Sequence, residues 1–317
     1  MNSWKFLKSG DLVDIVAPGS ATSLNELNAG IDFLKSWGLR ARVREPLFSG
    51  HPYVSSDADK RVGDLKKALL AKDSQAVWCL RGGYGALQMV PGLLKLKPPQ
   101  SSNKRSKLLI GYSDISTLHL WLNKVWKWPS CHGPLLDGMA QKKHSEKDSR
   151  EFCNLLFGVQ KQVVFDGLEA MNKAAEKIKR IEAPIMAGNL VVLASSLGSP
   201  LALKAKGKIL CLEEIGERGY RIDRLLFQLE NSGALNGCEA ILLGSFLGGD
   251  EPGGQNKNYV SMALSQFAER TKIPVYQGLQ IGHGTVNRPL FLGVKAKLVR
   301  KEKSSPASLI VESGGRE

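Results

Sequence analysis

The chain has 317 residues, 43% hydrophobic and 23% charged, which is enough for two domains with real cores and argues against global disorder. It has no run of about 18 or more apolar residues, which excludes a membrane-spanning helix. The net charge of +14 would suit a nucleic-acid partner, but the lysines are scattered and there is no RNA-binding aromatic motif or Cys/His finger, so we expect neither nucleic acid nor membrane as a partner.

Strand and helix signals alternate through the first half of the chain. Apolar strands are predicted at 12–17, 76–80 and 107–111, and helices at 23–37, 57–71, 86–90 and 114–126, with Pro91-Gly92 ending or kinking the third. Strands separated by helices of this length indicate parallel βαβ units, and ligands of such sheets bind beyond the carboxyl ends of the strands.

The second half indicates another α/β or β-rich domain. Strands are predicted at 208–212, 240–245, 275–277, 291–298 and 309–311, and helices at 223–232 and 259–270. Because the stretch before them has no clear pattern, we expect an N-terminal α/β domain at 1–165, a linker at 166–182 and a C-terminal domain at 183–317.

The cysteines and the N-terminus bear on metal binding and location. Five scattered cysteines without CxxC spacing argue against a disulfide framework and a zinc site, and Cys79 and Cys211 are expected to be buried. The N-terminus leads straight into the strand-like residues 12–16 without the pattern of a secretory signal, so we expect a cytoplasmic protein.

A serine lies in the sharp turn between a strand and a helix, in Leu108-Leu109-Ile110-Gly111-Tyr112-Ser113-Asp114. Such a turn lifts Ser113 above the sheet edge, beside backbone N–H groups of the helix N-terminus, as in a nucleophile elbow. A plain helix N-cap explains the same residues.

Gly82-Gly83-Tyr84-Gly85 could bring N–H groups close to an oxyanion or a phosphate, or form an ordinary turn.

Two acids and one histidine are the other candidates. Strand alternation makes the side chains of Glu213 and Glu214 diverge, so that one can face a site while the other faces away; solvated strand-end acids are the alternative. His283 lies between two glycines and could relay a proton or be a plain loop residue. The rival His132 is interpreted as a structural loop residue near the site.

Taken together, these segments resemble the LD-carboxypeptidase family, the muramoyltetrapeptide carboxypeptidases. The resemblance covers nearly the whole chain and is carried by residues 13–20, 81–85, 110–114, 131–134, 186–190, 212–214, 220–224 and 282–284.

The resemblance implies a serine peptidase with Ser113 as nucleophile, His283 as base and Glu213 orienting the histidine. The oxyanion hole would be the backbone N–H groups of Gly83 and Asp114. The implied fold is an N-terminal parallel-sheet domain like that of class I glutamine amidotransferases and a C-terminal α/β, β-rich domain, with the active site between them and a homodimer as the assembly. No metal or cofactor is implied.

The implied reaction removes the terminal D-Ala from a muropeptide tetrapeptide at an LD bond, through an acyl-enzyme, in peptidoglycan recycling. Glu214 departs from the aspartate that the family often has there, which leaves the role of the second acid open. Candidates for binding the substrate carboxylate are Arg81, Arg218, Arg221 and Arg288. Alternatives are a microcin-immunity peptidase of the same family, which cleaves peptidyl-nucleotide conjugates, and a non-catalytic muropeptide-binding protein.

Overall fold

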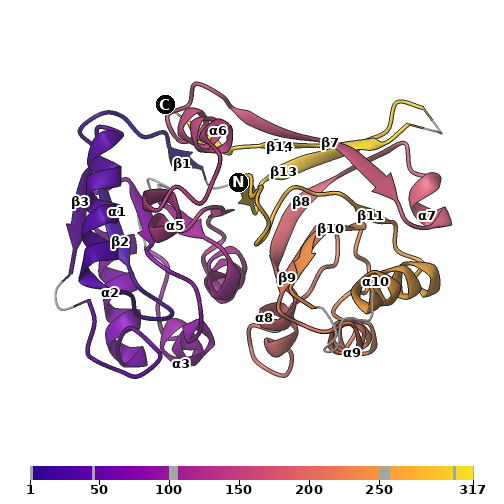
Figure 1. Cartoon of the computed structure of the whole chain (residues 1–317), viewed down its shortest axis with the longest axis horizontal. Coiled ribbons are helices and arrows are strands. Elements are labelled where there is room, and N and C mark those ends of the chain that lie inside the picture. The colour runs from indigo at the N-terminus through magenta and orange to yellow at the C-terminus, as the bar shows by residue number, and fades with distance from the viewer. Residues whose placement is uncertain (1–2, 45–46, 100–105, 250–257, 303–304, 317) are drawn as a thin grey trace. The chain divides into compact units, whose positions relative to one another are not determined.

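The chain divides into two compact units (Figure 1). The computed structural model describes residues 3–44, 47–99, 106–249, 258–302 and 305–316. The first unit consists of residues 1–161, 288–293 and 313–317, and the second of residues 162–287 and 294–312.

A six-stranded sheet forms the centre of the first unit, with strand order β12-β6-β5-β4-β2-β3. Its strands are β2 (Leu12–Val16), β3 (Arg40–Val43), β4 (Ala76–Cys79), β5 (Leu108–Gly111), β6 (Ser130–His132) and β12 (Leu290–Leu292). All pairs are parallel except β12 with β6. Because every residue of β4 and β5 is buried, the middle of the sheet is covered on both faces, as parallel sheets require. The strands predicted at β2, β4 and β5 are confirmed, and Cys79 is buried as predicted.

Local capping residues mark the starts of some helices of the first unit. They are α1 (Leu24–Ser36), α2 (Ala58–Leu70), α3 (Val90–Leu93), α4 (Ser116–Trp121), α5 (Leu136–Ala140) and α6 (Glu146–Leu156). Ser23 caps α1 in a capping box with Glu26. Pro91-Gly92 was expected to end or kink the helix predicted at 86–90, and it does not end it: residues 86–89 form a 3-10 turn, and Pro91 lies in the first turn of α3, where a missing N–H costs nothing.

A closed barrel of seven strands forms the second unit, in the order β10-β11-β7-β14-β13-β8-β9. Its strands are β7 (Gln162–Ala170), β8 (Arg180–Asn189), β9 (Ile209–Ile215), β10 (Ala240–Leu247), β11 (Val275–Gln277), β13 (Lys295–Val299) and β14 (Ala307–Glu312). Strands β8 to β11 run parallel and the other pairs are antiparallel. The helices are α7 (Lys173–Glu176), α8 (Leu190–Ser195), α9 (Gly219–Asn231) and α10 (Tyr259–Arg270), of which α9 packs on α8 and α10.

The structure differs from the sequence predictions in two stretches. Residues 166–182, expected as a linker, contribute to β7, α7 and the start of β8 inside the second unit. The single strand expected at 291–298 is two strands, because Gly293 has a φ of +74° and breaks the extended backbone. As a result β12 pairs in the first unit and β13 in the second.

Short strands β1 (Trp4–Lys5) and β15 (Gly315–Arg316) form a separate parallel pair in the first unit. In the part of the chain that the structure describes, no helix is long and apolar enough to cross a membrane.

Candidate active site

Ser113 occupies a strained position two residues after the end of the central strand β5. Its φ is +65°, in the left-handed region that residues other than glycine rarely adopt. A 3-10 turn at Ser113–Ile115 and then α4 follow at once, and the Ser116 hydroxyl donates to the Ser113 carbonyl at 2.6 Å. A plain N-cap has extended backbone, so this geometry matches a strained strand-turn-helix elbow rather than a simple cap.

The glycine loop lies next to Ser113 in the same unit. A Cβ added at Gly82 would lie 3.2 Å from the Ser113 Cβ, and one at Gly83 only 2.3 Å from the Ser20 hydroxyl oxygen. The Ser20 N–H donates to the Gly82 carbonyl at 2.9 Å, and the Tyr84 N–H donates to the Ser20 hydroxyl at 3.1 Å. The glycines therefore allow a close backbone approach beside the serine.

Asp114 follows the serine and is only 5% exposed. Its Oδ2 accepts a hydrogen bond from the Ala86 N–H at 2.8 Å, so its side chain is joined to the end of the glycine loop. Burial raises the pKa of this carboxyl to about 6, against the opposing effects of the Ala86 hydrogen bond and the Arg61 charge.

A histidine–glutamate pair forms in the second unit. Glu213, fully buried near the end of β9, is hydrogen-bonded through Oε2 to Nδ1 of His283 at 2.7 Å, and the His283 side chain is 15% exposed. Gly282 has a φ of +109°, and an added Cβ would lie 2.8 Å from Glu213 Oε2, so only glycine brings this loop against the acid. The Gly282 N–H donates to Asn287 Oδ1 at 3.0 Å. A carboxylate on Nδ1 leaves Nε2 for proton transfer.

Glu214 points the other way, as strand alternation predicts. Its carboxylate accepts hydrogen bonds from Asn189 Nδ2 at 2.9 Å and from the N–H groups of Val191 and Ile215 at 2.8 Å each. Because Val191 is in the first turn of α8, Glu214 caps that helix. Burial raises the pKa of the Glu214 carboxyl. The two adjacent acids therefore have different surroundings.

Two other histidines lie near the Ser113 turn. His132, expected in a loop, is the last residue of strand β6 and is fully buried; its ring packs edge-on to Tyr112, with centroids 5.7 Å apart. His119 of α4 donates through Nε2 to the Gly111 carbonyl at 2.8 Å, and burial lowers its pKa to about 4. Both support the backbone of the turn.

Of the four arginines named as candidates for binding the substrate carboxylate, three form ion pairs with acids of their own unit. The pairs are Arg81 with Glu26 (2.8 Å) and Asp137 (2.7 Å), Arg221 with Glu217 (3.3 Å), and Arg288 with Glu151 (2.5 Å). Arg218, which precedes α9, is exposed and forms no ion pair among the described residues. It is thus the only one of these four without a carboxylate partner in that part of the chain.

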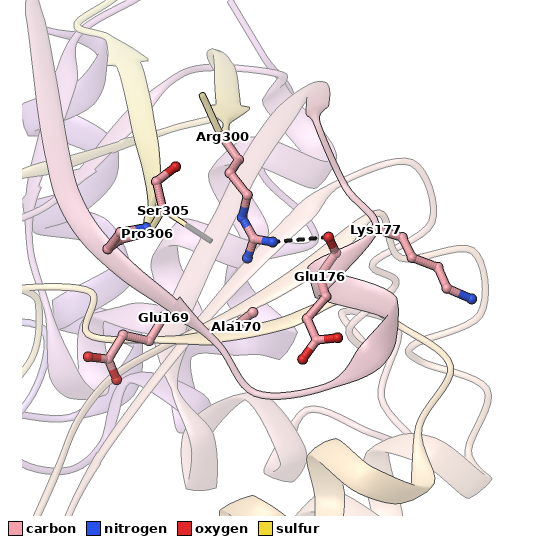
Figure 2. Close-up of a pocket in the computed structure, with 7 residues that line it drawn as sticks. All are labelled: Glu169, Ala170, Glu176, Lys177, Arg300, Ser305 and Pro306. Atoms are coloured by element: carbon pink, nitrogen blue, oxygen red, sulfur yellow. Dashed lines mark hydrogen bonds between the residues drawn. The ribbon is translucent and has the colours of Figure 1, made fainter. Parts of the chain in front are cut away.

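Cavities lie among the described residues of the second unit. One, of about 710 Å³, is lined by Glu169, Ala170, Glu176, Lys177, Arg300, Ser305 and Pro306 (Figure 2). Figure 2 shows Arg300 reaching the Glu176 carbonyl, to which it donates at 3.0 Å, while Lys177 points away. Neither Glu213 nor His283 lines this cavity, so it is separate from the pair.

The smaller cavity, of about 340 Å³, lies at the carboxyl ends of β10 and β11, where parallel sheets bind ligands. Its lining includes Gly244 of β10, where an added Cβ would lie 3.3 Å from the Glu213 Cβ. Neither Glu213 nor His283 lines this cavity. Among the residues described, no cluster of three or more His, Cys, Asp or Glu side chains could hold a metal ion.

The predicted residues meet within each unit. Ser113, Gly83 and Asp114 belong to the first unit, and Glu213 and His283 to the second. A serine on a strained turn above a parallel sheet and a histidine held by a buried carboxylate are features of hydrolases with a serine nucleophile.

Comparison with known proteins identifies the family. Residues 13–133 match the LD-carboxypeptidase N-terminal domain, and residues 182–298 match the LD-carboxypeptidase C-terminal domain. The murein tetrapeptide carboxypeptidase of Pseudomonas aeruginosa is 32% identical over 90% of this chain and 92% of its own length. The chain belongs to the LD-carboxypeptidase family, and the resemblance seen in the sequence is confirmed.

Solved structures share the fold along the whole chain. The muramoyltetrapeptide carboxypeptidase of Oxalobacter formigenes is similar with a TM-score of 0.80 and 26% identity, covering 95% of this chain and 98% of its own. The microcin C7 self-immunity protein has a TM-score of 0.80, 19% identity and full coverage of both chains, which is a likeness of fold alone. The predicted fold class, α/β with parallel sheets and a β-rich C-terminal part, is confirmed.

Proposed function

We propose that this protein is a serine carboxypeptidase that removes the terminal D-Ala from muropeptide tetrapeptides at an LD bond, in cytoplasmic peptidoglycan recycling. Family membership and the relatives named as murein tetrapeptide and muramoyltetrapeptide carboxypeptidases support the substrate class. The observation that carries the proposal is the 2.7 Å hydrogen bond between His283 Nδ1 and the fully buried Glu213.

The proposed mechanism follows from the chemistry of these groups. With His283 Nδ1–H donating to Glu213, Nε2 takes the proton of the Ser113 hydroxyl as that oxygen attacks the scissile carbonyl. The N–H groups of Gly83 and Asp114 bind the developing oxyanion. The protonated imidazole then gives its proton to the leaving D-Ala amine, and water releases the acyl-enzyme with His283 again as base.

The proposal needs Ser113 and His283 to come within hydrogen-bonding distance during the reaction. The strained turn at Ser113 supports its role as nucleophile, because such strain is retained where a side chain must be presented to a ligand. A crystal structure with a trapped acyl-enzyme would test this requirement. An Nε2 far from the Ser113 oxygen would contradict it.

The decisive experiment is mass spectrometry of a free tetrapeptide ending in D-Ala after incubation with wild type and with Ser113→Ala. We expect wild type to release one D-Ala and the variant to lose at least about 10³-fold in rate, because removing the nucleophile leaves only binding and oxyanion stabilisation. Release by both proteins would contradict the role of Ser113.

The same assay separates the alternatives. If wild type leaves the tetrapeptide intact but cleaves a peptidyl-nucleotide conjugate, the microcin-immunity reaction replaces the proposed one. If it cleaves neither but binds muropeptide, the protein is a non-catalytic binder.

A further inference from the structure

An arginine from outside the sequence motifs binds the backbone around the glycine loop. Arg61 of α2 is 3% exposed, and its Nη1 donates to the carbonyls of Pro18 at 2.6 Å and Gly85 at 2.8 Å. Its Nε donates to the Ser56 carbonyl and its Nη2 to Gln88 Oε1, each at 2.7 Å. One guanidinium therefore joins three separate segments of the first unit.

Asp114 binds the other end of the same Gly85–Ala86 peptide group. Its Oδ2 accepts from the Ala86 N–H at 2.8 Å, so the carbonyl of Gly85 is bound by a cation and the following N–H by an anion. The positive charge of Arg61 also acts to lower the pKa of this carboxyl. A buried acid and a buried arginine are tolerated only where each is well hydrogen-bonded. Asp114 and Arg61 both form such hydrogen bonds with the backbone of the glycine loop.

The packing around the loop is tight on a third side. A Cβ added at Gly19 would lie 2.2 Å from the Gly82 carbonyl oxygen and 3.0 Å from Asp114 Oδ2. The loop is therefore fixed by the 18–20 turn, by Asp114 and by Arg61, while its other end lies against Ser113.

We propose that Asp114, through its side chain, and Arg61 are positioning residues that hold loop 82–86 so that the Gly83 N–H stays aimed at the oxyanion. The inference rests on the proposed function, since that function makes Gly83 an oxyanion donor. The inference goes beyond that function because it assigns a role to two side chains that do not touch the reacting atoms. Their effect on the rate would come from the position of the Gly83 N–H, since an error of about 1 Å in a donor position is enough to reduce catalysis.

A merely structural pair would stabilise the unit without affecting the loop. The chain offers a matched control in Asp14, which is 1% exposed and is bonded to Arg42 at 2.6 Å, but in the described part of the chain is not bonded to loop 82–86. Asp14→Asn should lower thermal stability and leave kcat within about twofold. Asp114→Ala should lower both stability and kcat.

Hydrogen exchange measured by mass spectrometry tests the geometry without any substrate. In Asp114→Ala and in Arg61→Lys, which keeps the charge but loses the planar fork, we expect exchange in residues 82–88 to accelerate at least about tenfold. Strand β4, just before the loop, should stay protected, and Asp14→Asn should leave residues 82–88 as in wild type. Unchanged exchange of this loop in a folded Asp114→Ala would overturn the inference.

Kinetics of D-Ala release from the free tetrapeptide test the consequence. We expect Asp114→Ala to lower kcat about 10²-fold with KM within about threefold, and Asp114→Asn, which keeps an acceptor for the Ala86 N–H, to recover much of the loss. A loosened loop with wild-type kcat would also overturn the inference. If wild type itself releases no D-Ala, the proposed function fails, whereas the exchange experiment still decides whether the two side chains hold the loop.

Discussion

Neighbouring residues at the end of β9 have the same charge and opposite surroundings. Glu213 faces His283, whereas Glu214 accepts two hydrogen bonds from the start of α8 and a third from the Ile215 N–H. In the proposed mechanism Glu213 orients the imidazole and stabilises its cation, and Glu214 contributes only to folding. The departure from the family's usual aspartate at Glu214 thus falls on a helix cap.

Substituting each acid by its amide separates these roles. Glu213→Gln should lower kcat for D-Ala release by about 10²–10⁴-fold, because the amide no longer stabilises the imidazolium. Glu214→Gln should keep kcat within about threefold and lower the free energy of unfolding by about 1–2 kcal/mol. Steady-state kinetics and urea unfolding measure both, and the reverse pattern would assign the catalytic role to Glu214.

Asp114 predicts a pH effect on stability. Burial raises its folded pKa from 3.8 to about 6, so the folded state binds more protons than the unfolded state between these values. The favourable contribution is present below pH 4 and is lost as the pH rises through 6. Relative to Asp114→Asn, the free energy of unfolding of wild type should therefore fall by up to about 3 kcal/mol between pH 4 and pH 7.

Urea unfolding of wild type and Asp114→Asn at pH 4, 5, 6 and 7 measures this difference. Other titrating groups cancel between the two proteins. A difference that does not change with pH would show that the Asp114 pKa is not raised.

At the scale of elements, glycines decide where strands end. Gly293 turns the chain with a φ of +74° and separates β12 from β13, which belong to different units. By contrast, Gly63 lies inside α2 without a positive φ, and an added Cβ meets nothing within 4 Å. Replacing glycine by alanine should therefore have opposite effects on the free energy of unfolding at Gly293 and Gly63.

Gly293→Ala should lower the free energy of unfolding by about 1–2 kcal/mol, since alanine is strained in the left-handed region. Gly63→Ala should raise it by about 0.5–1 kcal/mol through better helix propensity. Thermal melts of the two variants beside wild type measure both effects. A stabilised Gly293→Ala variant would contradict the turn as the reason that the strand divides.

At the scale of the whole molecule, we expect a homodimer, as the family resemblance implies. Light scattering coupled to size-exclusion chromatography should give about twice the chain mass of 34.6 kDa. A mass of one chain at micromolar concentration would contradict this expectation.

Both units contain segments from distant parts of the chain. Residues 288–293 and 313–317 return to the first unit after most of the second has formed. Such returns cannot be recognised from local composition, which is why the sequence suggested two consecutive domains and a linker. Strand β7, expected partly as linker, has only Val163, Phe165 and Leu168 buried, so it lacks the continuous apolar run that identifies a central strand.

The sequence by itself determined the features that depend on neighbouring residues. The Ser23 cap, the strands β2, β4 and β5, the divergence of Glu213 from Glu214 and the sharp turn at Ser113 follow from local backbone geometry and from side-chain alternation.

Only the tertiary structure decided which distant groups meet. The contact between His283 and Glu213 spans 70 residues, and it depends on strand pairing in the second-unit barrel and on a glycine that admits the loop. Arg61 gave no signal in the sequence because it is one of several charged residues on a helix, and only folding buries its guanidinium against the carbonyls of Pro18 and Gly85. Burial and hydrogen bonding of this kind arise from packing between segments, which no local pattern encodes.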